Sequence, residues 1–291
     1  MFPLIGIVIV FGAVVGGYLM EKGNLLVLMQ PAELVIIGGA AIGTLVIANP
    51  PHILREIMSG LTGIVRPSRF NRAWYLQSLK MLYDLFDQAR RSGLPSLEAE
   101  IEDPAKGKIL SAHGKIVRDH HTRAFICDTF RLLTLGDVDP FALDQLLESD
   151  MDVHHHEANE PINALHTVAE SLPGLGIVAA VLGVVITMGS LGGRPEEIGH
   201  KVAAALVGTF LGILLCYGLV GPLATLMAKT AESERAYYQV LRSCISAFSK
   251  GQAPLLAVES GRRLTPGHVR PTFQELEKAC RARSEQTQAA A

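Results

Sequence analysis

The residues that bear on chemistry lie in two apolar stretches, 172–193 and 202–228, which contain no Asp, Glu, Lys, Arg or His. These stretches instead offer hydroxyl and thiol groups, at Thr187, Ser190, Thr209, Cys216, Tyr217 and Thr225. A membrane protein that moves a cation unaided is expected to keep an ionisable side chain within its membrane segments. If an ion crosses this protein, the titrating carboxylate must therefore come from another polypeptide.

Each stretch also carries one proline, Pro173 or Pro222. Ser171-Leu172-Pro173 is typical of a helix start, with a capping hydroxyl and a proline in the first turn. Pro222 lies inside an apolar run, where it removes a backbone hydrogen bond and predicts a kink or a polar notch. Both prolines lie about 20 residues, or roughly 30 Å, from the connecting loop at 1.5 Å per residue. The sequence thus predicts two backbone irregularities at one depth and a working site there.

The elements that position these residues are membrane helices. Both stretches exceed the roughly 20 apolar residues that cross a bilayer, so they predict a transmembrane hairpin. Residues 2–20 form a third apolar segment without the features of a cleaved signal peptide. Residues 31–51 form a fourth, with Glu33 at one edge. The fold class predicted is an all-α integral membrane protein with four transmembrane helices.

Basic residues set the expected orientation, because they accumulate on the cytoplasmic side. They follow the second and fourth spans, at Arg55, Arg66, Arg69, Arg72, Lys229, Arg235 and Arg242, whereas the two short loops hold only Lys22, Arg194 and Lys201. We therefore expect residues 52–171 and the tail to be cytoplasmic, with both termini inside.

The region between the second and third spans is predicted to be helical. Residues 72–91 show the apolar spacing of an amphipathic helix, and Asp139-Pro140 is a helix start. The tail is expected to continue the fourth span as a helix to about residue 250, to break over residues 251–271 and to end in a short helix. The predicted divisions are 1–51 (spans 1 and 2), 52–171 (a large cytoplasmic helical domain), 172–228 (spans 3 and 4) and 229–291 (a cytoplasmic tail).

Other classes of function find little support. The four cysteines show no CxxC spacing, so neither a zinc site nor a disulfide framework is indicated. His154, His155 and His156 are consecutive, and on a helix they point in different directions, so no metal site is expected. Motifs for phosphate binding or a catalytic nucleophile are missing from the sequence, which disfavours an enzyme. We expect no cofactor and no nucleic-acid partner.

Glycine pairs at four-residue spacing favour close helix contacts. They occur as Gly12 with Gly16, Gly39 with Gly43 and Gly208 with Gly212. Such spacing lets helix backbones approach within a membrane, and it favours oligomerisation.

Several blocks of sequence resemble the motility protein A family, the larger stator subunit of the bacterial flagellar motor. The blocks are Ser171-Leu172-Pro173 followed by Gly176-Ile-Val-Ala-Ala, Val207-Gly-Thr-Phe-Leu-Gly-Ile-Leu-Leu, Gly221-Pro222-Leu-Ala-Thr, Ala257-Val-Glu259 and Arg270-Pro271. The resemblance runs nearly end to end. The last two spans are also similar, more distantly, to the ExbB and TolQ subunits that energise outer-membrane processes.

The resemblance implies a rotary, ion-driven machine in the bacterial inner membrane. Five copies would surround two copies of motility protein B, which supplies the ion-binding aspartate and an anchor to peptidoglycan. Pro173 and Pro222 match the family's functional prolines near that aspartate. Arg90 and Glu98 match the charged pair that contacts the rotor protein FliG, and Asp150 falls where relatives carry another acid.

The resemblance also favours H⁺ over Na⁺ as the driving ion. Sodium-driven relatives typically place a threonine where this chain has Ala180, and a dehydrated Na⁺ would need that oxygen. Thr209 is present in both types and does not discriminate.

Three alternatives remain open at this point. A transporter that works alone would need its own intramembrane ionisable residue. An ExbB/TolQ-type energiser would share the ring but drive an outer-membrane complex. A sodium-driven stator would share both the ring and the rotor.

Overall fold

A computed structural model of the chain describes residues 2–63, 68–136, 138–189 and 195–288, with side chains as far as Arg281. Every regular element within these ranges is helical, and no strand occurs among them, as the sequence predicts. Arg66, Ser190 and Arg194, which entered the sequence arguments, lie outside the described residues.

The chain divides into two compact units. Unit 1 comprises residues 1–67 and 156–231, and unit 2 comprises residues 68–155 and 232–291. Unit 1 contains α1 (Phe2–Met20), α2 (Leu25–Leu28), α3 (Pro31–Ala48), α4 (Pro51–Gly63), α10 (Pro195–Leu215) and the π-helical segment η3 (Cys216–Val220). Unit 2 contains α5 (Arg72–Ser92), η1 (Leu94–Leu97), α6 (Glu98–Glu102), η2 (Ser111–His113), α7 (Gly114–Val117), α8 (His120–Leu135), α12 (Pro254–Leu264) and α13 (Phe273–Gln288). Helices α9 (Pro140–Met188) and α11 (Gly221–Ser249) contribute residues to both units.

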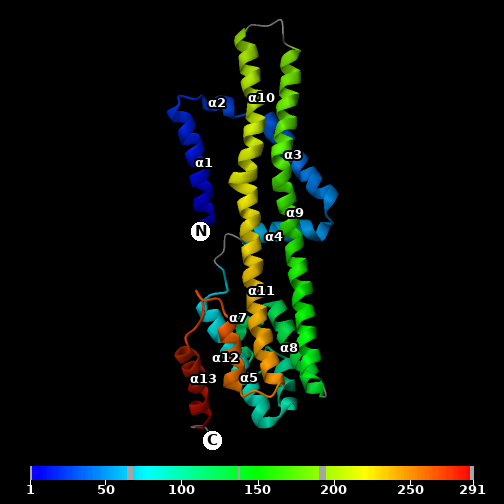
Figure 1. The fold of residues 1–291 in the computed structure, drawn as a ribbon, viewed down its shortest axis with the longest axis vertical. Coiled ribbons are helices and arrows are strands. Elements are labelled where there is room, and N and C mark those ends of the chain that lie inside the picture. The colour runs from blue at the N-terminus through cyan, green and yellow to red at the C-terminus, as the bar shows by residue number, and fades with distance from the viewer. Residues whose placement is uncertain (1, 64–67, 137, 190–194, 289–291) are drawn as a thin grey trace. The chain divides into compact units, whose positions relative to one another are not determined.

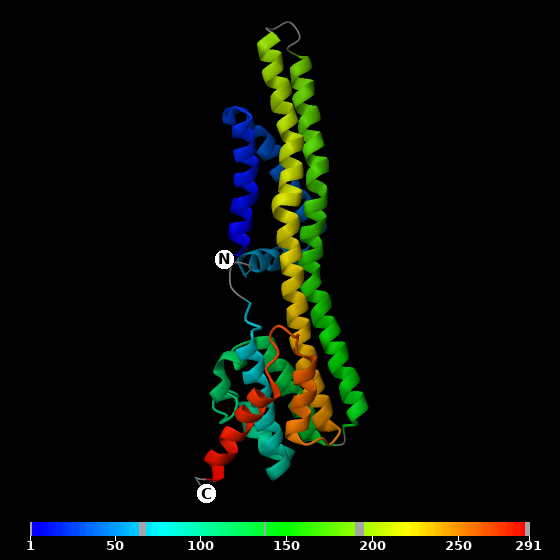
Figure 2. The same ribbon diagram turned by 60° about the vertical axis from the view of Figure 1, so that its left-hand side comes forward.

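Four helical stretches among the described residues are long and apolar enough to cross a membrane, which confirms the predicted number of spans. They are Phe2–Met20, Leu25–Ala48, Pro140–Met188 and Pro195–Ser249. Within unit 1, α9 and α10 run side by side in both views of the ribbon (Figures 1 and 2). Their contact is the apolar hairpin expected from the sequence.

Two helices begin where the sequence predicts, at residues 72 and 140, and a capping side chain precedes each. Asn71 Oδ1 accepts the Trp74 N–H at 3.0 Å and starts α5. Asp139 Oδ2 accepts the Ala142 N–H at 2.9 Å, and α9 begins at the following proline. Both side chains satisfy backbone donors that have no partner within the helix.

The helix start predicted at Ser171-Leu172-Pro173 is wrong, because α9 continues through it and holds Pro161 and Pro173 in its interior. Ser171 Oγ donates to the Val168 carbonyl at 2.7 Å within the helix instead of capping an N-terminus. A proline removes one backbone hydrogen bond. In a helix of 49 residues, the bonds on either side outweigh that loss.

Two further boundaries differ from the sequence prediction. The 251–271 region is not a simple break, since α12 occupies Pro254–Leu264. Pro254 opens that helix at a position where the missing N–H has no intrahelical acceptor to lose. The segment predicted over residues 31–51 is shorter as a helix, because α3 ends at Ala48, and α4 begins at Pro51 and buries Ile53 and Ile57 in unit 1.

Unit 2 has a large core of its own. Helix α5 buries one face, including Leu79, Leu82 and Phe86, and α11 contributes Tyr237 and Leu241. Phe86 stacks on Phe248, and the Ser78 and Tyr237 hydroxyls lie 2.8 Å apart inside this core. This packing makes the helices of unit 2 a rigid base for the charged side chains on its surface.

Candidate functional site

The two long apolar helices of unit 1 meet at a contact made of glycines. A Cβ added at Gly176 would lie 2.7 Å from the Gly208 carbonyl oxygen, and one added at Gly212 would lie 2.5 Å from the Leu172 carbonyl oxygen. Only glycine fits at these positions, because the opposing atoms belong to the backbone. We call this contact, formed by Gly176, Gly208 and Gly212, the glycine crossing.

The predicted glycine spacings therefore differ in what they do within this chain. Gly208 and Gly212 make the expected close helix contact, between α10 and α9. An added Cβ would meet no described atom within 4 Å at Gly12 or Gly16, or at Gly39 or Gly43. Those two pairs lie on faces of α1 and α3 that are open in the single chain.

The glycine crossing brings together two candidates for the ion pathway. A Cβ added at Gly208 would lie 3.2 Å from the Ala180 nitrogen, and one at Gly176 would lie 3.3 Å from Thr209 Cα. Both residues are half-buried. Thr209 and Ala180 thus stand at the same level of the hairpin.

The backbone irregularity predicted near Pro222 is present as the π-helical segment η3, two residues ahead of the proline. The Gly221 N–H bonds to the Cys216 carbonyl, five residues earlier, instead of the usual four. Segments of this kind arise inside longer helices where the regular hydrogen-bond pattern is interrupted. Pro222 itself is exposed in the single chain.

The expectation that Pro173 and Pro222 share one depth is wrong. Gly176 faces Gly208 and Gly212, and Gly183 faces Ala205, which places Pro173 close to the level of Gly212. Pro222 follows ten residues after Gly212, so along the helix it lies on the order of 12–15 Å beyond Pro173 at 1.5 Å per residue. The count from the sequence failed because α10 already begins at Pro195, inside the stretch taken as loop.

Unit 1 contains a buried acidic residue to which the sequence analysis assigned no role. Glu33, in the first turn of α3, is only 7% exposed, and its Oε2 atom lies against Gly208. The sequence feature that could have indicated it is the single charge at the edge of the apolar segment 31–51.

The proposed rotor-contacting pair lies on the surface of unit 2. Arg90 is in the last turn of α5, and Glu98 is the first residue of α6. Both side chains are exposed, and neither side chain forms a hydrogen bond or ion pair with another described residue. The segments that carry them are tied together, because Gln88 Nε2 donates to the Ser96 carbonyl at 2.8 Å.

Buried neighbours fix both charged residues in place. Ala89 and Leu97, which precede Arg90 and Glu98, are 6% and 0% exposed. Gly93, between them, has a φ of 81°, a conformation that favours glycine. The exposed charges therefore sit on an ordered part of the surface.

A carboxylate that the sequence did not single out supports α6. Glu100, 5% exposed, accepts the backbone N–H groups of Lys108, Ile109 and Leu110 at 2.7–3.1 Å. It lies two residues after Glu98 and joins α6 to the segment that follows it. Its neighbour Glu102 instead pairs with Arg131 at the surface, and this hydrogen bond raises the pKa of the Arg131 guanidinium.

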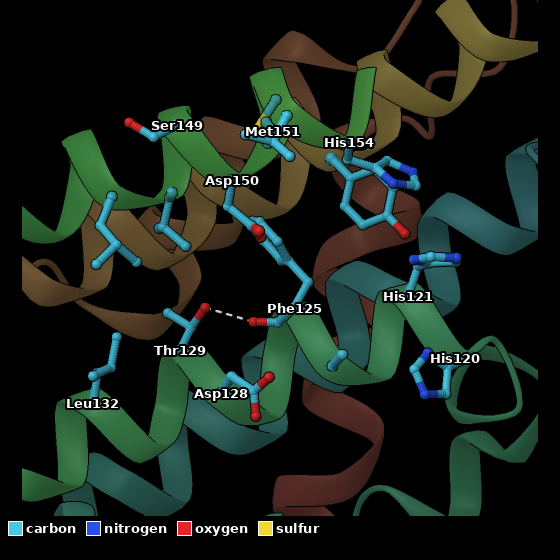
Figure 3. Close-up of a pocket in the computed structure, with 15 residues that line it drawn as sticks. His120, His121, Phe125, Asp128, Thr129, Leu132, Ser149, Asp150, Met151 and His154 are labelled. Carbon is cyan, nitrogen blue, oxygen red and sulfur yellow. Dashed lines mark hydrogen bonds between the residues drawn. The ribbon is translucent and has the colours of Figure 1, made fainter. Parts of the chain in front are cut away.

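Asp150 lies apart from that pair in the sequence and lines a hollow of about 540 Å³ in unit 2. Figure 3 shows Asp150 on α9 and Asp128 on α8 on either side of it, with His121 and His154 at one end. His154 Nε2 lies 3.8 Å from Glu234 Oε1, and its ring centroid lies 4.8 Å from that of His121. Asp150 is exposed, so its carboxylate can reach a partner.

The possible metal ligands among the described residues do not cluster at one site. No group of three or more His, Cys, Asp or Glu side chains among them is arranged to hold a metal ion. His154 faces Tyr238 and Glu234, whereas His156 lies 3.9 Å from Glu160. His154 and His156 thus face different neighbours.

The four spans and the glycine-rich hairpin define a class of membrane protein. Residues 117–239 match the model of the MotA/TolQ/ExbB proton channel family, and residues 4–93 match that of the motility protein A N-terminal region. The chain is 40% identical to motility protein A of Escherichia coli over 97% of its own length and 96% of that protein. It is 36% identical to the chemotaxis protein LafT of Vibrio parahaemolyticus, over 96% of this chain and 98% of that one. The chain belongs to the motility protein A family.

Solved structures agree with the fold. The chain resembles a structure titled C. jejuni MotAB with a TM-score of 0.75 and 17% identity, over 91% of this chain and 95% of that one. It resembles the flagellar MotAB stator complex of Bacillus subtilis with a TM-score of 0.71 and 23% identity, over 88% and 92%. These likenesses confirm the all-α, four-span architecture.

Proposed function

We propose that this chain is an ion-conducting stator subunit of the bacterial flagellar motor and that it has no enzymatic activity. The observation that carries the proposal is its 40% identity to a motility protein A over nearly the full length of both chains. The match to the motility protein A N-terminal model favours this function over that of an ExbB/TolQ-type energiser.

The partner in this proposal is motility protein B, around which the chain forms a ring, expected to be a pentamer. The apolar stretches 172–193 and 202–228 hold no ionisable residue, so the partner's aspartate supplies the main ion-binding carboxylate. Both termini and unit 2 are cytoplasmic in this arrangement, as the basic residues after the second and fourth spans require. The divisions at residues 51, 171 and 228 separate membrane from aqueous parts.

Torque then arises from a charge that is switched on and off beside the hairpin. An ionised carboxylate in an apolar ring is costly, so it seeks hydroxyls, water or freed backbone groups, and protonation removes that demand. Thr209 at the glycine crossing and the irregular backbone ahead of Pro222 offer such groups. One elementary charge crossing 100 mV releases about 2.3 kcal/mol, enough to rearrange a few weak contacts.

Unit 2 transmits the step to the rotor protein FliG through Arg90 and Glu98, with Asp150 as a further contact. The side chains of Arg90 and Glu98 are exposed and form no ion pair with another described residue, which supports this role, since both charges are available to a partner. The small side chain of Ala180 beside Gly208 supports H⁺ as the driving ion, because it provides no oxygen for Na⁺.

A deletion of this chain tests the function. Cells without it should grow and keep an intact envelope but fail to swim, and the wild-type gene should restore swimming. Normal swimming combined with a defect in uptake or envelope integrity would favour the ExbB/TolQ-type alternative. In liposomes, ion flux should require both this chain and its partner, so flux through the chain alone would favour a self-sufficient transporter.

Charge reversals test the rotor contact separately. Arg90→Glu and Glu98→Lys should each slow the motor without lowering the amount of complex in the membrane. Lys106→Glu is the control, because this exposed lysine pairs with its own neighbour Asp103. Full motor speed in the Arg90→Glu/Glu98→Lys double variant would refute the rotor contact.

The driving ion is tested in sodium-free medium. Swimming should persist there and stop when a protonophore collapses the proton gradient. Swimming that depends on Na⁺ would make this chain a sodium-driven stator subunit.

A further inference from the structure

Glu33 is the acidic residue that the fold places inside the apolar part of unit 1. It lies in the first turn of α3 and is 7% exposed. Its Oε2 atom is buried and has no hydrogen-bond partner among the described residues. Buried polar atoms in folded proteins nearly always have such a partner, so this one needs an explanation.

The surroundings of this carboxyl group are the glycine crossing. A Cβ added at Gly208 would come within 2.6 Å of Glu33 Oε2, within 3.1 Å of Ala179 Cβ and within 3.2 Å of the Ala180 nitrogen. The absence of a side chain at Gly208 thus makes room for the carboxyl group between α9 and α10. Thr209 is the next residue, so Glu33 stands at the level of the candidate ion pathway.

The charged groups of the neighbouring helices lie farther away. The part of α9 between residues 172 and 188 carries none. In α10 the nearest are Lys201 and His200, seven and eight residues before Gly208. That separation is roughly 10–12 Å along the helix at 1.5 Å per residue. Helix α2, which also packs on α10, consists of Leu25–Leu28 and has no charge.

A purely structural role accounts poorly for this placement. A carboxylate in the first turn of a helix is stabilised only weakly by the helix dipole at an exposed position. Burying a charged group without a partner costs much more free energy than the dipole returns. Either a proton or a cation must therefore accompany the buried carboxyl group, and ionisable residues in such positions commonly serve ion transport.

We propose that Glu33 is a proton-binding group of this chain, which accepts a proton at the glycine crossing and passes it toward the partner's aspartate. The inference rests on the proposed stator function and adds a second carboxyl group to its pathway. A carboxylate oxygen of Glu33 binds H⁺ to give the neutral acid and returns to the carboxylate when the proton leaves. The orientation proposed above places this end of α3 toward the outer side of the membrane, where the proton enters.

The test uses the complete complex with its partner, in cells without the chromosomal copy and in purified form in lipid. Glu33→Gln keeps the size and polarity of the side chain but cannot exchange a proton. This variant should have a lower proton flux and a lower motor speed than the wild type. Its motor speed should also depend less on external pH. Glu33→Asp should keep that dependence in weakened form. Glu21→Gln is the matched control, since Glu21 is an exposed acid in the short loop before α2.

Infrared spectroscopy gives a readout that packing alone would not change. Wild-type complex minus Glu33→Gln complex should show a carboxylic acid C=O band that disappears as the pH is raised. Wild-type flux and pH dependence in Glu33→Gln, or no such band, would overturn the inference. If the wild-type gene itself fails to restore swimming, the proposed function fails instead, so the two failures can be told apart.

Discussion

Replacing Glu100 tests how the surface beside Glu98 is held in place. The carboxylate of Glu100 binds three backbone N–H groups, from Lys108, Ile109 and Leu110, at 2.7–3.1 Å. Glutamine keeps one acceptor oxygen but turns the other into a donor, which repels an N–H group. We therefore expect Glu100→Gln to destabilise this segment without removing α6.

The magnitude follows from the hydrogen bonds that are lost. A hydrogen bond to a charged group contributes about 1.5–3 kcal/mol, and an unsatisfied buried N–H costs about 1–3 kcal/mol. For Glu100→Gln we expect a loss of about 2–3 kcal/mol, and for Glu100→Ala about 3–5 kcal/mol. At 1.4 kcal/mol per factor of ten, the glutamine variant should exchange the amides of residues 108–110 roughly 30- to 150-fold faster.

Hydrogen exchange of the full-length chain in detergent measures this directly, residue by residue. Glu102→Gln is the control, because Glu102 forms an exposed pair with Arg131 that contributes at most about 1 kcal/mol. Its amide exchange at residues 108–110 should match that of the wild type. Unchanged exchange in Glu100→Gln would refute the assignment of these amides to the carboxylate.

Three further predictions follow from single contacts. Gly212→Ala should destabilise the hairpin by about 1–3 kcal/mol, because its methyl group meets the α9 backbone, whereas Gly43→Ala meets no described atom within 4 Å. Equal thermal stability of these two variants in detergent would contradict a close backbone contact at Gly212. Pro222→Ala supplies the N–H that proline lacks, and it should slow the motor without changing the amount of complex in the membrane. Full motor speed in this variant would show that torque generation does not need Pro222. The hydrogen bond from Arg262 lowers the pKa of the Glu259 carboxyl group from 4.5. The ionised carboxylate therefore stabilises the fold above pH 4.5, and this stabilisation is lost as the pH falls through the lowered pKa of the folded state. The difference in melting temperature between wild type and Glu259→Gln should persist at pH 7 and narrow below pH 4.5.

Features that depend on neighbouring residues in sequence could be predicted. The four spans follow from the length and composition of apolar runs, α5 follows from the apolar spacing of residues 72–91, and the start of α9 follows from Asp139-Pro140. Each of these signals acts within one helical turn or one run of sequence. The structure places them where the sequence does.

Features that depend on contacts between distant segments could not be predicted. Ser171 and Pro173 form the same local pattern at a helix start and inside a helix, and only the continuation of α9 decides between the two. The register of α9 against α10 depends on which glycines meet, so counting from the loop misplaced Pro222. Glu100 looked like one acid among several in its segment, because its partners lie eight to ten residues further along the chain.

Glu33 illustrates the same limit for the ion pathway. The two long stretches of the hairpin, residues 172–193 and 202–228, contain no ionisable residue. It did not follow that the hairpin lacks an ionisable neighbour within the same chain. Gly208 has no side chain, and the space it leaves is filled by the carboxyl group of Glu33 in α3, a residue more than 170 positions before Gly208 in the sequence. An ion pathway built from several helices must therefore be searched on every helix that touches it, because the acid and the space it occupies come from different segments.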